Sequence, residues 1–272
     1  MKSVIFAITA TAALLLSTGA QASLVATAGG KGVYDNVNNV TWTSDANLMA
    51  TQAASYSGGA SAYVAAVIAA SGGVIHDMPN AYDTPSNSGT YTLSASDFVT
   101  SGTYAGTMSW FGAKAWVKYL NATNYAGTNT WALPTTVDNY STSYGYPNGA
   151  GGNPSQSSSQ MAQLFYGNLG QVAGSSITTI HNSSYALFNQ VRSDDVYWSG
   201  AEYSASPPVA WYFYTGDGGQ SISDKSFDGY ALAVSPGQVS AVPVPGAAWL
   251  LGSGLMGLAG LRRRKVIAQS AA

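Results

Sequence analysis

Val196-Tyr197-Trp198-Ser199, Ala210-Trp211-Tyr212-Phe213-Tyr214 and Tyr230-Ala231-Leu232-Ala233-Val234 are three runs of strand-forming residues in the last third of the chain. Aromatic and β-branched residues favour strands. Pro207-Pro208 separates the first two runs and Gly216-Asp217-Gly218-Gly219 the last two, as is typical of turns between antiparallel strands. This part of the chain is therefore predicted to form an antiparallel sheet.

Two segments before this sheet have helical periodicity. Residues 108–120 carry an apolar stripe, from which Lys114 and Lys118 are expected to point away. Residues 159–169 begin with serine caps and carry a second stripe. The stripe residues are Trp110, Ala113, Trp116, Val117 and Leu120 in the first segment, and Met161, Leu164, Phe165 and Leu169 in the second. Two main helices with antiparallel strands predict an α+β fold.

The remaining segments fill in the body, which is predicted to be one domain over residues 24–238. Residues 32–42 read as two short strands around an Asn/Asp turn, and residues 131–135 as a strand stopped by proline. Residues 60–70 are compatible with a short helix, and residues 71–106 are predicted to be a loop-rich elaboration.

Buried tryptophans are the expected centre of this domain, because an indole requires burial and a partner for its N–H group. Five of them lie on periodic or motif segments. They are Trp110, Trp116, Trp131, Trp198 and Trp211.

Composition excludes several classes of function. The 272 residues include no cysteine, which excludes disulfides, cysteine-ligated metals and a thiol nucleophile. All twelve acidic residues but only five of the ten basic ones lie within 24–238, so this body has a formal charge of −7. An acidic body argues against nucleic acid as a partner.

The N-terminus has the pattern of a secretory signal peptide over residues 1–22. Lys2 precedes an apolar run from Val4 to Leu16, and Ala20-Gln21-Ala22 forms an Ala-x-Ala site. We expect export by the Sec pathway and cleavage by signal peptidase after Ala22. The alternative is a buried first helix.

The C-terminus combines an uncharged run of 20 residues, 242–261, with a cluster of four cations. Such a run is just long enough to cross a membrane, with the body on the outer side and the cations in the cytoplasm. The defining residues are Pro243, Val244, Pro245, Arg262, Arg263, Arg264 and Lys265.

Residues 242–265 resemble the PEP-CTERM sorting signal of Gram-negative bacteria. The resemblance implies transient anchoring in the inner membrane, cleavage near Pro-x-Pro by an exosortase-type membrane protease, and transfer of the body to the cell surface or outside the cell. Val244 stands where the name-giving motif has Glu. An ordinary tail anchor is the alternative.

Five fragments of the body occur in an order that resembles the Lcl C-terminal domain family, named after a bacterial collagen-like adhesin. The resemblance implies a C-type-lectin-like fold. Two arginines usual in the family are replaced by Ala132 and Ser235, and the charge of −7 would repel a sulfated polysaccharide. The fragments are residues 131–135, 161–165, 198–203, 210–213 and 230–237, after an opening at 34–47.

Candidates for metal or acid–base chemistry are few. His76 and His181 are far apart in sequence and are interpreted as loop histidines, and Glu202 is expected to fix a loop through backbone hydrogen bonds. Two acidic clusters, 194–195 and 217–228, contain ligands of the type that Ca²⁺ prefers. Their spacing matches no calcium loop, so they are interpreted as turn residues, and no cofactor is predicted.

Four tyrosines are the candidates for facing a ligand, because aromatic rings stack on sugars. They are Tyr197, Tyr203, Tyr212 and Tyr214. Strand alternation is expected to send about half of the surrounding aromatic group into the core.

The predicted function is that of a non-catalytic surface or matrix protein in an exopolysaccharide layer or biofilm, which binds carbohydrate or another envelope component. Two alternatives stay open: a secreted hydrolase that uses aspartates such as Asp217 and Asp224, and a structural coat protein without a ligand.

Overall fold

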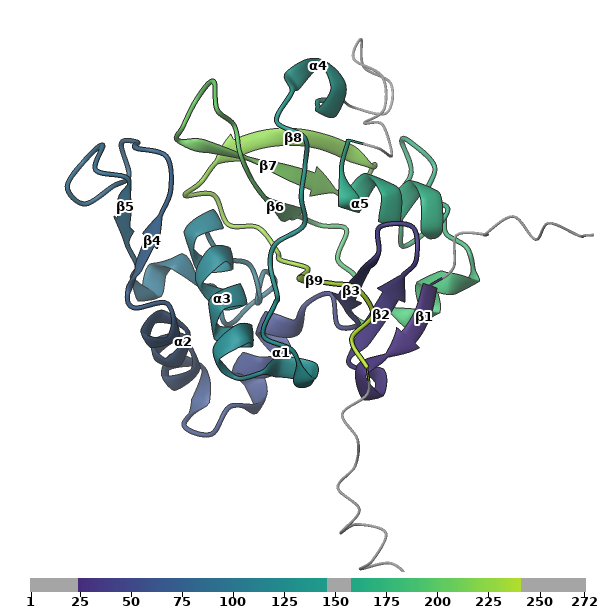
Figure 1. Cartoon of the computed structure of the whole chain (residues 1–272), viewed down its shortest axis with the longest axis horizontal. Helices are drawn as coiled ribbons and strands as arrows, with labels where there is room; N and C mark the ends of the chain where they lie inside the picture. The colour runs from purple at the N-terminus through teal and green to yellow at the C-terminus, as the bar shows by residue number, and fades with distance from the viewer. Residues whose placement is uncertain (1–23, 146–157, 241–272) are drawn as a thin grey trace, which may run out of the picture.

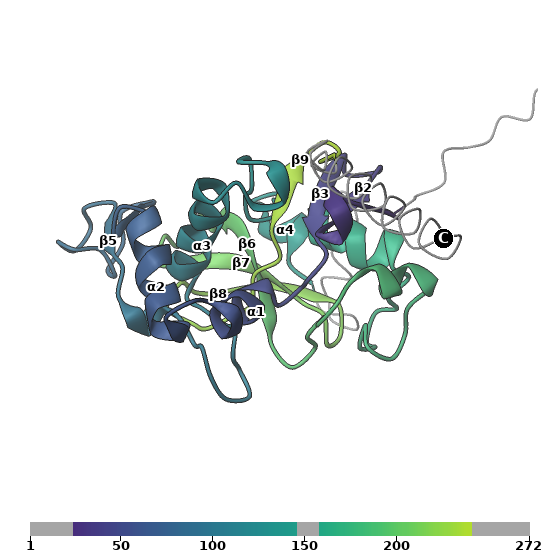
Figure 2. The same ribbon diagram turned by 90° about the horizontal axis from the view of Figure 1, so that it is seen from below.

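The computed structural model describes residues 24–145 and 158–240. Helices α2 and α3 lie side by side at one end of the molecule together with the hairpin β4–β5, and strands β1 to β3 lie toward the other end (Figures 1 and 2). The α+β class is confirmed, since antiparallel sheets and several helices share these residues.

The first sheet joins the two ends of the described chain. Its strands are β1 (Leu24–Thr27), β2 (Gly32–Asp35), β3 (Val40–Thr43) and β9 (Val234–Pro236), in that order and all antiparallel. Asp35 makes the predicted turn between β2 and β3, because its Oδ1 accepts hydrogen bonds from the backbone N–H groups of Val37 and Asn38.

Three helices of eight or more residues within the described ranges form the helical end: α1 (Leu48–Ser55), α2 (Gly59–Ala70) and α3 (Trp110–Ala122). Helix α2 confirms the short helix suggested at 60–70, and α3 confirms the first of the two main helices predicted. The predicted stripe of α3 is buried, and Ser109 caps the helix by accepting a hydrogen bond from Gly112 N. Lys118 is exposed as expected. Lys114 is half-buried instead, with its ammonium 5.2 Å from the centroid of the Trp110 ring.

The predicted loop-rich segment 71–106 contains a short hairpin of β4 (Val74–His76) and β5 (Thr90–Thr92). The predicted helix at 159–169 is a single α-helical turn, α5 (Gln160–Ala162), that continues as the π-helix Gln163–Asn168. One further helical turn is α4 (Tyr140–Ser143). Short 3₁₀ turns are Ala28–Gly30, Ala95–Asp97, Tyr125–Gly127 and Ser183–Leu187.

The second sheet has the order β6 (Val196–Glu202), β7 (Val209–Tyr214) and β8 (Gly219–Asp224), all antiparallel. The prediction of the first two strands is confirmed, but the third strand is 219–224 and not 230–234. Residues 230–234 instead connect the two sheets: Tyr230 makes a parallel bridge to Tyr197, and Val234 pairs with Trp42.

The predicted strand at 131–135 makes only an isolated bridge, between Ala132 and Val234. The side chain of Asn121 in α3 makes the two backbone hydrogen bonds that a neighbouring strand would make to Trp131. It donates to Trp131 O and accepts from Trp131 N. The segment is therefore held against α3 and the β9 end of the first sheet.

The β6–β8 sheet separates two apolar clusters. Trp198 and Ala210 belong to the cluster shared with the helices, whereas Tyr197 and Phe213 belong to the cluster shared with β2, β3 and α5. The five tryptophans expected in the core are all buried, each at most 3% exposed.

The two predicted terminal signals, residues 1–22 and 242–265, lie outside the described residues. Within the ranges 24–145 and 158–240, no helix has the length and apolar character required to cross a membrane.

Candidate functional site

Four aromatic rings gather around Trp211 of β7, and we call them the tyrosine patch: Tyr140, Tyr144, Tyr203 and Trp211. Tyr140 and Tyr144 stack with ring centroids 4.2 Å apart, and Tyr203 meets Trp211 edge-on at 5.7 Å. Tyr140 links the two pairs and is 45% exposed, whereas Trp211 is fully buried. The patch is a set of contacting aromatic rings, of which Tyr140 is accessible to solvent.

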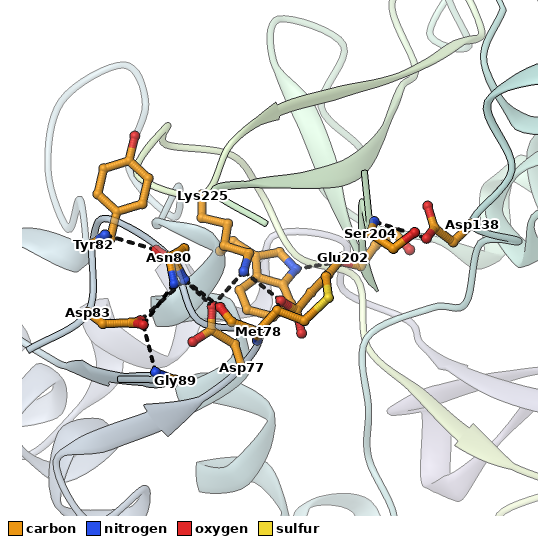
Figure 3. A network of polar contacts seen from close by, with 12 residues as sticks. Asp77, Met78, Asn80, Tyr82, Asp83, Gly89, Asp138, Glu202, Ser204 and Lys225 are labelled. Atoms are coloured by element: carbon orange, nitrogen blue, oxygen red, sulfur yellow. Dashed lines mark hydrogen bonds and ion pairs between the residues drawn. The ribbon is translucent and has the colours of Figure 1, made fainter. Parts of the chain in front are cut away.

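Asp138 is hydrogen-bonded to a residue of the patch and to the neighbouring Ser204. Its carboxylate accepts hydrogen bonds from Trp211 Nε1 (2.9 Å) and from Ser204 N (3.0 Å), the second of which is visible in Figure 3. Burial opposes ionisation, but the hydrogen bonds from Ser204 and Trp211 outweigh it and lower the pKa of Asp138 below its ordinary value. The carboxylate is therefore charged at neutral pH beside the tyrosine rings.

A polar hollow of about 340 Å³ lies next along the same segment. Its lining includes Asn38, Thr135, Gln160 and Gln163, and the exposed side chain of Val137 stands at its rim. Gln160 Oε1 accepts a hydrogen bond from Thr135 N at 2.8 Å, which ties the start of α5 to this wall. Amides and hydroxyls of this kind can both donate and accept hydrogen bonds.

A second hollow of about 350 Å³ lies between α3 and the same segment, and Thr135 lines both hollows. Lys114 and Lys118 line it together with Asn121 and Leu133. Burial lowers the pKa of Lys114.

The four tyrosines predicted to face a ligand do not share one surface. Tyr203 belongs to the tyrosine patch. The prediction for Tyr197 is wrong, because its ring is fully buried against Phe165 and Tyr230 and its hydroxyl accepts from Arg192 N. Both faces of β6 are buried at this point, with Tyr197 in one apolar cluster and Trp198 in the other.

Tyr212 and Tyr214 are half-buried on the face of β7 opposite to Trp211. The ring of Tyr212 packs against Trp198, and Tyr214 lies against Gly216. Sequence reasoning missed Tyr140, Tyr144 and Asp138, because they lie in a polar segment without periodicity. Their only signal is the density of tyrosine there.

The aspartates of the hydrolase alternative are not brought together. Asp217 accepts a hydrogen bond from Gly219 N as a turn residue, and Asp224 ends β8 on the surface. The two aspartates lie at opposite ends of the extended strand β8, which spans roughly 17 Å at about 3.3 Å per residue. The paired carboxylates of a glycoside hydrolase lie about 5–9.5 Å apart.

The other predicted metal candidates are also dispersed. Asp194 pairs with Arg192, and Asp195 accepts from Val196 N. His76 contacts Thr90, and His181 stacks on Tyr185. Within the described ranges, no group of three or more His, Asp or Glu side chains is arranged to hold a metal ion.

Glu202 fixes a loop, as predicted: its Oε2 accepts a hydrogen bond from Met78 N at 2.9 Å. The same oxygen also contacts Lys225, which contacts Asp77 in turn (Figure 3). This buried ionic cluster was missed, because its three members are far apart in the sequence and belong to no motif.

Comparison with known proteins finds no similarity: no family model, no curated protein and no solved structure matches the chain.

Proposed function

We propose that the chain is an exported, non-catalytic protein of the cell surface or extracellular matrix, and that its tyrosine patch binds neutral carbohydrate. One observation carries the proposal: an exposed, preorganised aromatic stack lies beside a hollow lined by amides and hydroxyls. Sugar rings stack on aromatic faces, and their hydroxyls match groups that donate and accept. The acidic body makes neutral glycans better partners than acidic ones.

Binding to a glycan array, with and without Ca²⁺, tests this proposal. We expect saturable binding without cleavage, and loss of most of it in Tyr140→Ala and Tyr203→Ala. Tyr104→Ala is the matched control, because Tyr104 is an equally exposed tyrosine, at 51%, outside the patch. Cleavage products would favour the hydrolase alternative, and no binding to any neutral or acidic glycan would favour a structural coat protein.

The second part of the proposal concerns the export and sorting of the protein. The Ala-x-Ala site at Ala22 and the Pro-x-Pro and cation cluster after residue 242 support export by the Sec pathway followed by exosortase processing. The intact mass of the extracellular form should lack residues 1–22 and the segment after about Pro243. An extracellular form that keeps its C-terminus would contradict the sorting proposal.

The ordered fragments of the body support membership of the Lcl C-terminal domain family and a C-type-lectin-like fold. The α+β arrangement is compatible with this proposal. Superposition of an experimental structure of this chain on a C-type-lectin-like domain would test it. A common order and direction of strands would support the proposal, and a different topology would contradict it.

A further inference from the structure

The ionic cluster of Lys225, Asp77 and Glu202 joins three separate parts of the fold (Figure 3). Asp77 follows β4, Glu202 ends β6 and Lys225 follows β8. Lys225 Nζ lies 2.5 Å from Asp77 Oδ2 and 2.6 Å from Glu202 Oε2. The side chains of Lys225 and Asp77 are completely buried, and that of Glu202 is 20% exposed.

Aromatic rings shield the amine from solvent. Lys225 Nζ lies 4.8 Å from the centroid of the Trp110 ring and 5.8 Å from that of Phe111, and both rings are buried. A charged amine and two carboxylates in such surroundings are costly, because their attraction must offset the loss of hydration of every charge.

Asp77 is the unusual member of the cluster. Its Oδ2 accepts hydrogen bonds from Lys225 and from Asn80 Nδ2, while its buried Oδ1 has no hydrogen-bond partner among the described residues. Burial raises the pKa of Asp77, with Lys225 acting in the opposite direction, so the neutral carboxyl form is favoured relative to an exposed aspartate.

We propose that Lys225 and Asp77 become joined by an intramolecular isopeptide bond, and that Glu202 moves the protons of this reaction. Glu202 takes a proton from the Lys225 ammonium and passes it to the Asp77 carboxylate, which leaves a neutral amine next to a neutral carboxyl group. The amine is a nucleophile only without its charge. Nζ then attacks the Cγ atom of Asp77, and the N–H group of Asn80 stabilises the negative charge that develops on Oδ2.

The reaction balances without an added reactant. A C–N bond forms, the bond between Cγ and Oδ1 breaks, and one water molecule leaves. Of the three protons on the lysine ammonium, one stays on the amide nitrogen and two leave with the oxygen. Glu202 ends as it began, and nothing is oxidised or reduced. The product removes one positive and one negative charge from the buried cluster.

The bond would connect residues that are 148 positions apart in a chain without cysteine. Closing so large a loop restricts the unfolded chain, which is also how a disulfide stabilises a protein. A covalent link of this kind is suited to a protein that must persist outside the cell, and it does not require that the protein bind any ligand.

Tryptic peptide mapping of the purified full-length chain tests the proposal. Trypsin does not cleave after an acylated lysine, so the wild type should yield residues 32–114 covalently joined to a peptide that spans position 225. The denatured protein should weigh one water molecule less than its sequence predicts. Complete cleavage after Lys225, with the full mass, would overturn the proposal.

Variants identify the atoms that react. Lys225→Arg keeps the charge but cannot form the amide, and Asp77→Ala removes the acceptor, so both should regain the full mass. Glu202→Gln keeps the size of the side chain and should leave the two peptides unlinked. Lys114→Arg is the matched control, since Lys114 is a nearby half-buried lysine, and it should retain the link. A mass deficit that persists in Lys225→Arg would place the water loss elsewhere and overturn the proposal.

Discussion

Two indole N–H groups connect α3 to the second sheet at the level of single residues. Trp110 Nε1 donates to Ser199 O (2.9 Å), and Trp198 Nε1 donates to Met108 O (3.0 Å). Each tryptophan therefore fills the core and also satisfies a carbonyl group of the other element. Loss of either ring removes packing and one buried hydrogen bond.

Trp198→Ala should lower the free energy of unfolding by about 3–5 kcal/mol, because a buried aromatic ring is lost and a cavity is left. Trp198→Phe keeps most of the apolar area but loses the hydrogen bond to Met108 O, at a cost of about 0.5–1.5 kcal/mol, because Met108 O still accepts a hydrogen bond from Gly229 N. Urea unfolding measures both variants. Tyr104→Ala is the exposed control, and a Trp198→Ala variant as stable as this control would contradict the placement of Trp198.

Gly106 is a position where a side chain cannot be accommodated. Its φ is +100°, and a Cβ atom there would lie 1.8 Å from Asn47 Oδ1. Asn47 cannot move freely, because its Nδ2 donates a hydrogen bond to Ala105 O and its backbone N–H donates to Asp45 Oδ1.

Gly106→Ala should therefore destabilise the protein more than Gly102→Ala, as measured by thermal or urea unfolding. Gly102 has a similarly positive φ of +81° but nothing within 4 Å of the added methyl group. The control should cost about 1–2 kcal/mol for the left-handed backbone alone. Gly106→Ala should cost about 1–3 kcal/mol more for the overlap, and equal losses would contradict the close approach of Asn47.

At the scale of elements, periodicity predicted best where one face of an element is buried. The stripe of α3 was visible in the sequence, because the core selects those apolar positions, whereas β6 and β7 were predicted from their density of strand-forming residues. Strand β8 was missed because its residues, Gly219 to Asp224, are mostly small or polar. The run 230–234 is richer in apolar residues and therefore resembled a strand more closely. It instead connects the two sheets, pairing with one at Tyr230 and with the other at Val234.

Other segments are positioned by side-chain hydrogen bonds, which periodicity in the sequence does not reveal. Asn121 is hydrogen-bonded to Trp131, and Asp138 to Trp211, and each bond joins residues of different elements. The candidate site depends on such contacts, so Tyr203 was the only member of the tyrosine patch among the predicted ligand-facing residues.

Asp138→Asn should loosen the segment that carries the patch, with an effect that depends on pH. The pKa of Asp138 is lowered in the folded state, so its stabilisation is present above about pH 4 and is lost as the pH falls through the folded pKa. The variant should therefore be less stable than the wild type at pH 7, and the difference should shrink toward pH 3. Thermal unfolding at both values measures this, and an equal difference at both would contradict the account.

At the scale of the whole molecule, acidic groups dominate the electrostatics of the body. Burial is the first cause that raises the pKa of Asp195 and of Asp228, and neighbouring aspartates raise both further. A raised carboxyl pKa changes the pH dependence of stability in the opposite direction to the lowered pKa of Asp138. Between the unfolded and the folded pKa, the folded state binds more protons, so stability falls as the pH rises.

Asp195→Asn should make the protein more stable than the wild type at pH 7, with a smaller difference near pH 4. The isosteric amide can keep the acceptor for Val196 N, now 2.8 Å from Asp195 Oδ1, and it removes a charge that burial and Asp228 disfavour. The loss of wild-type stability should begin near pH 4, where the unfolded carboxyl ionises, and end once the folded carboxyl has ionised. Melting temperatures across pH 4–8 measure this, with Asp138→Asn as the control of opposite sign. A constant difference between Asp195→Asn and the wild type would show that the variant acts through packing and not through charge.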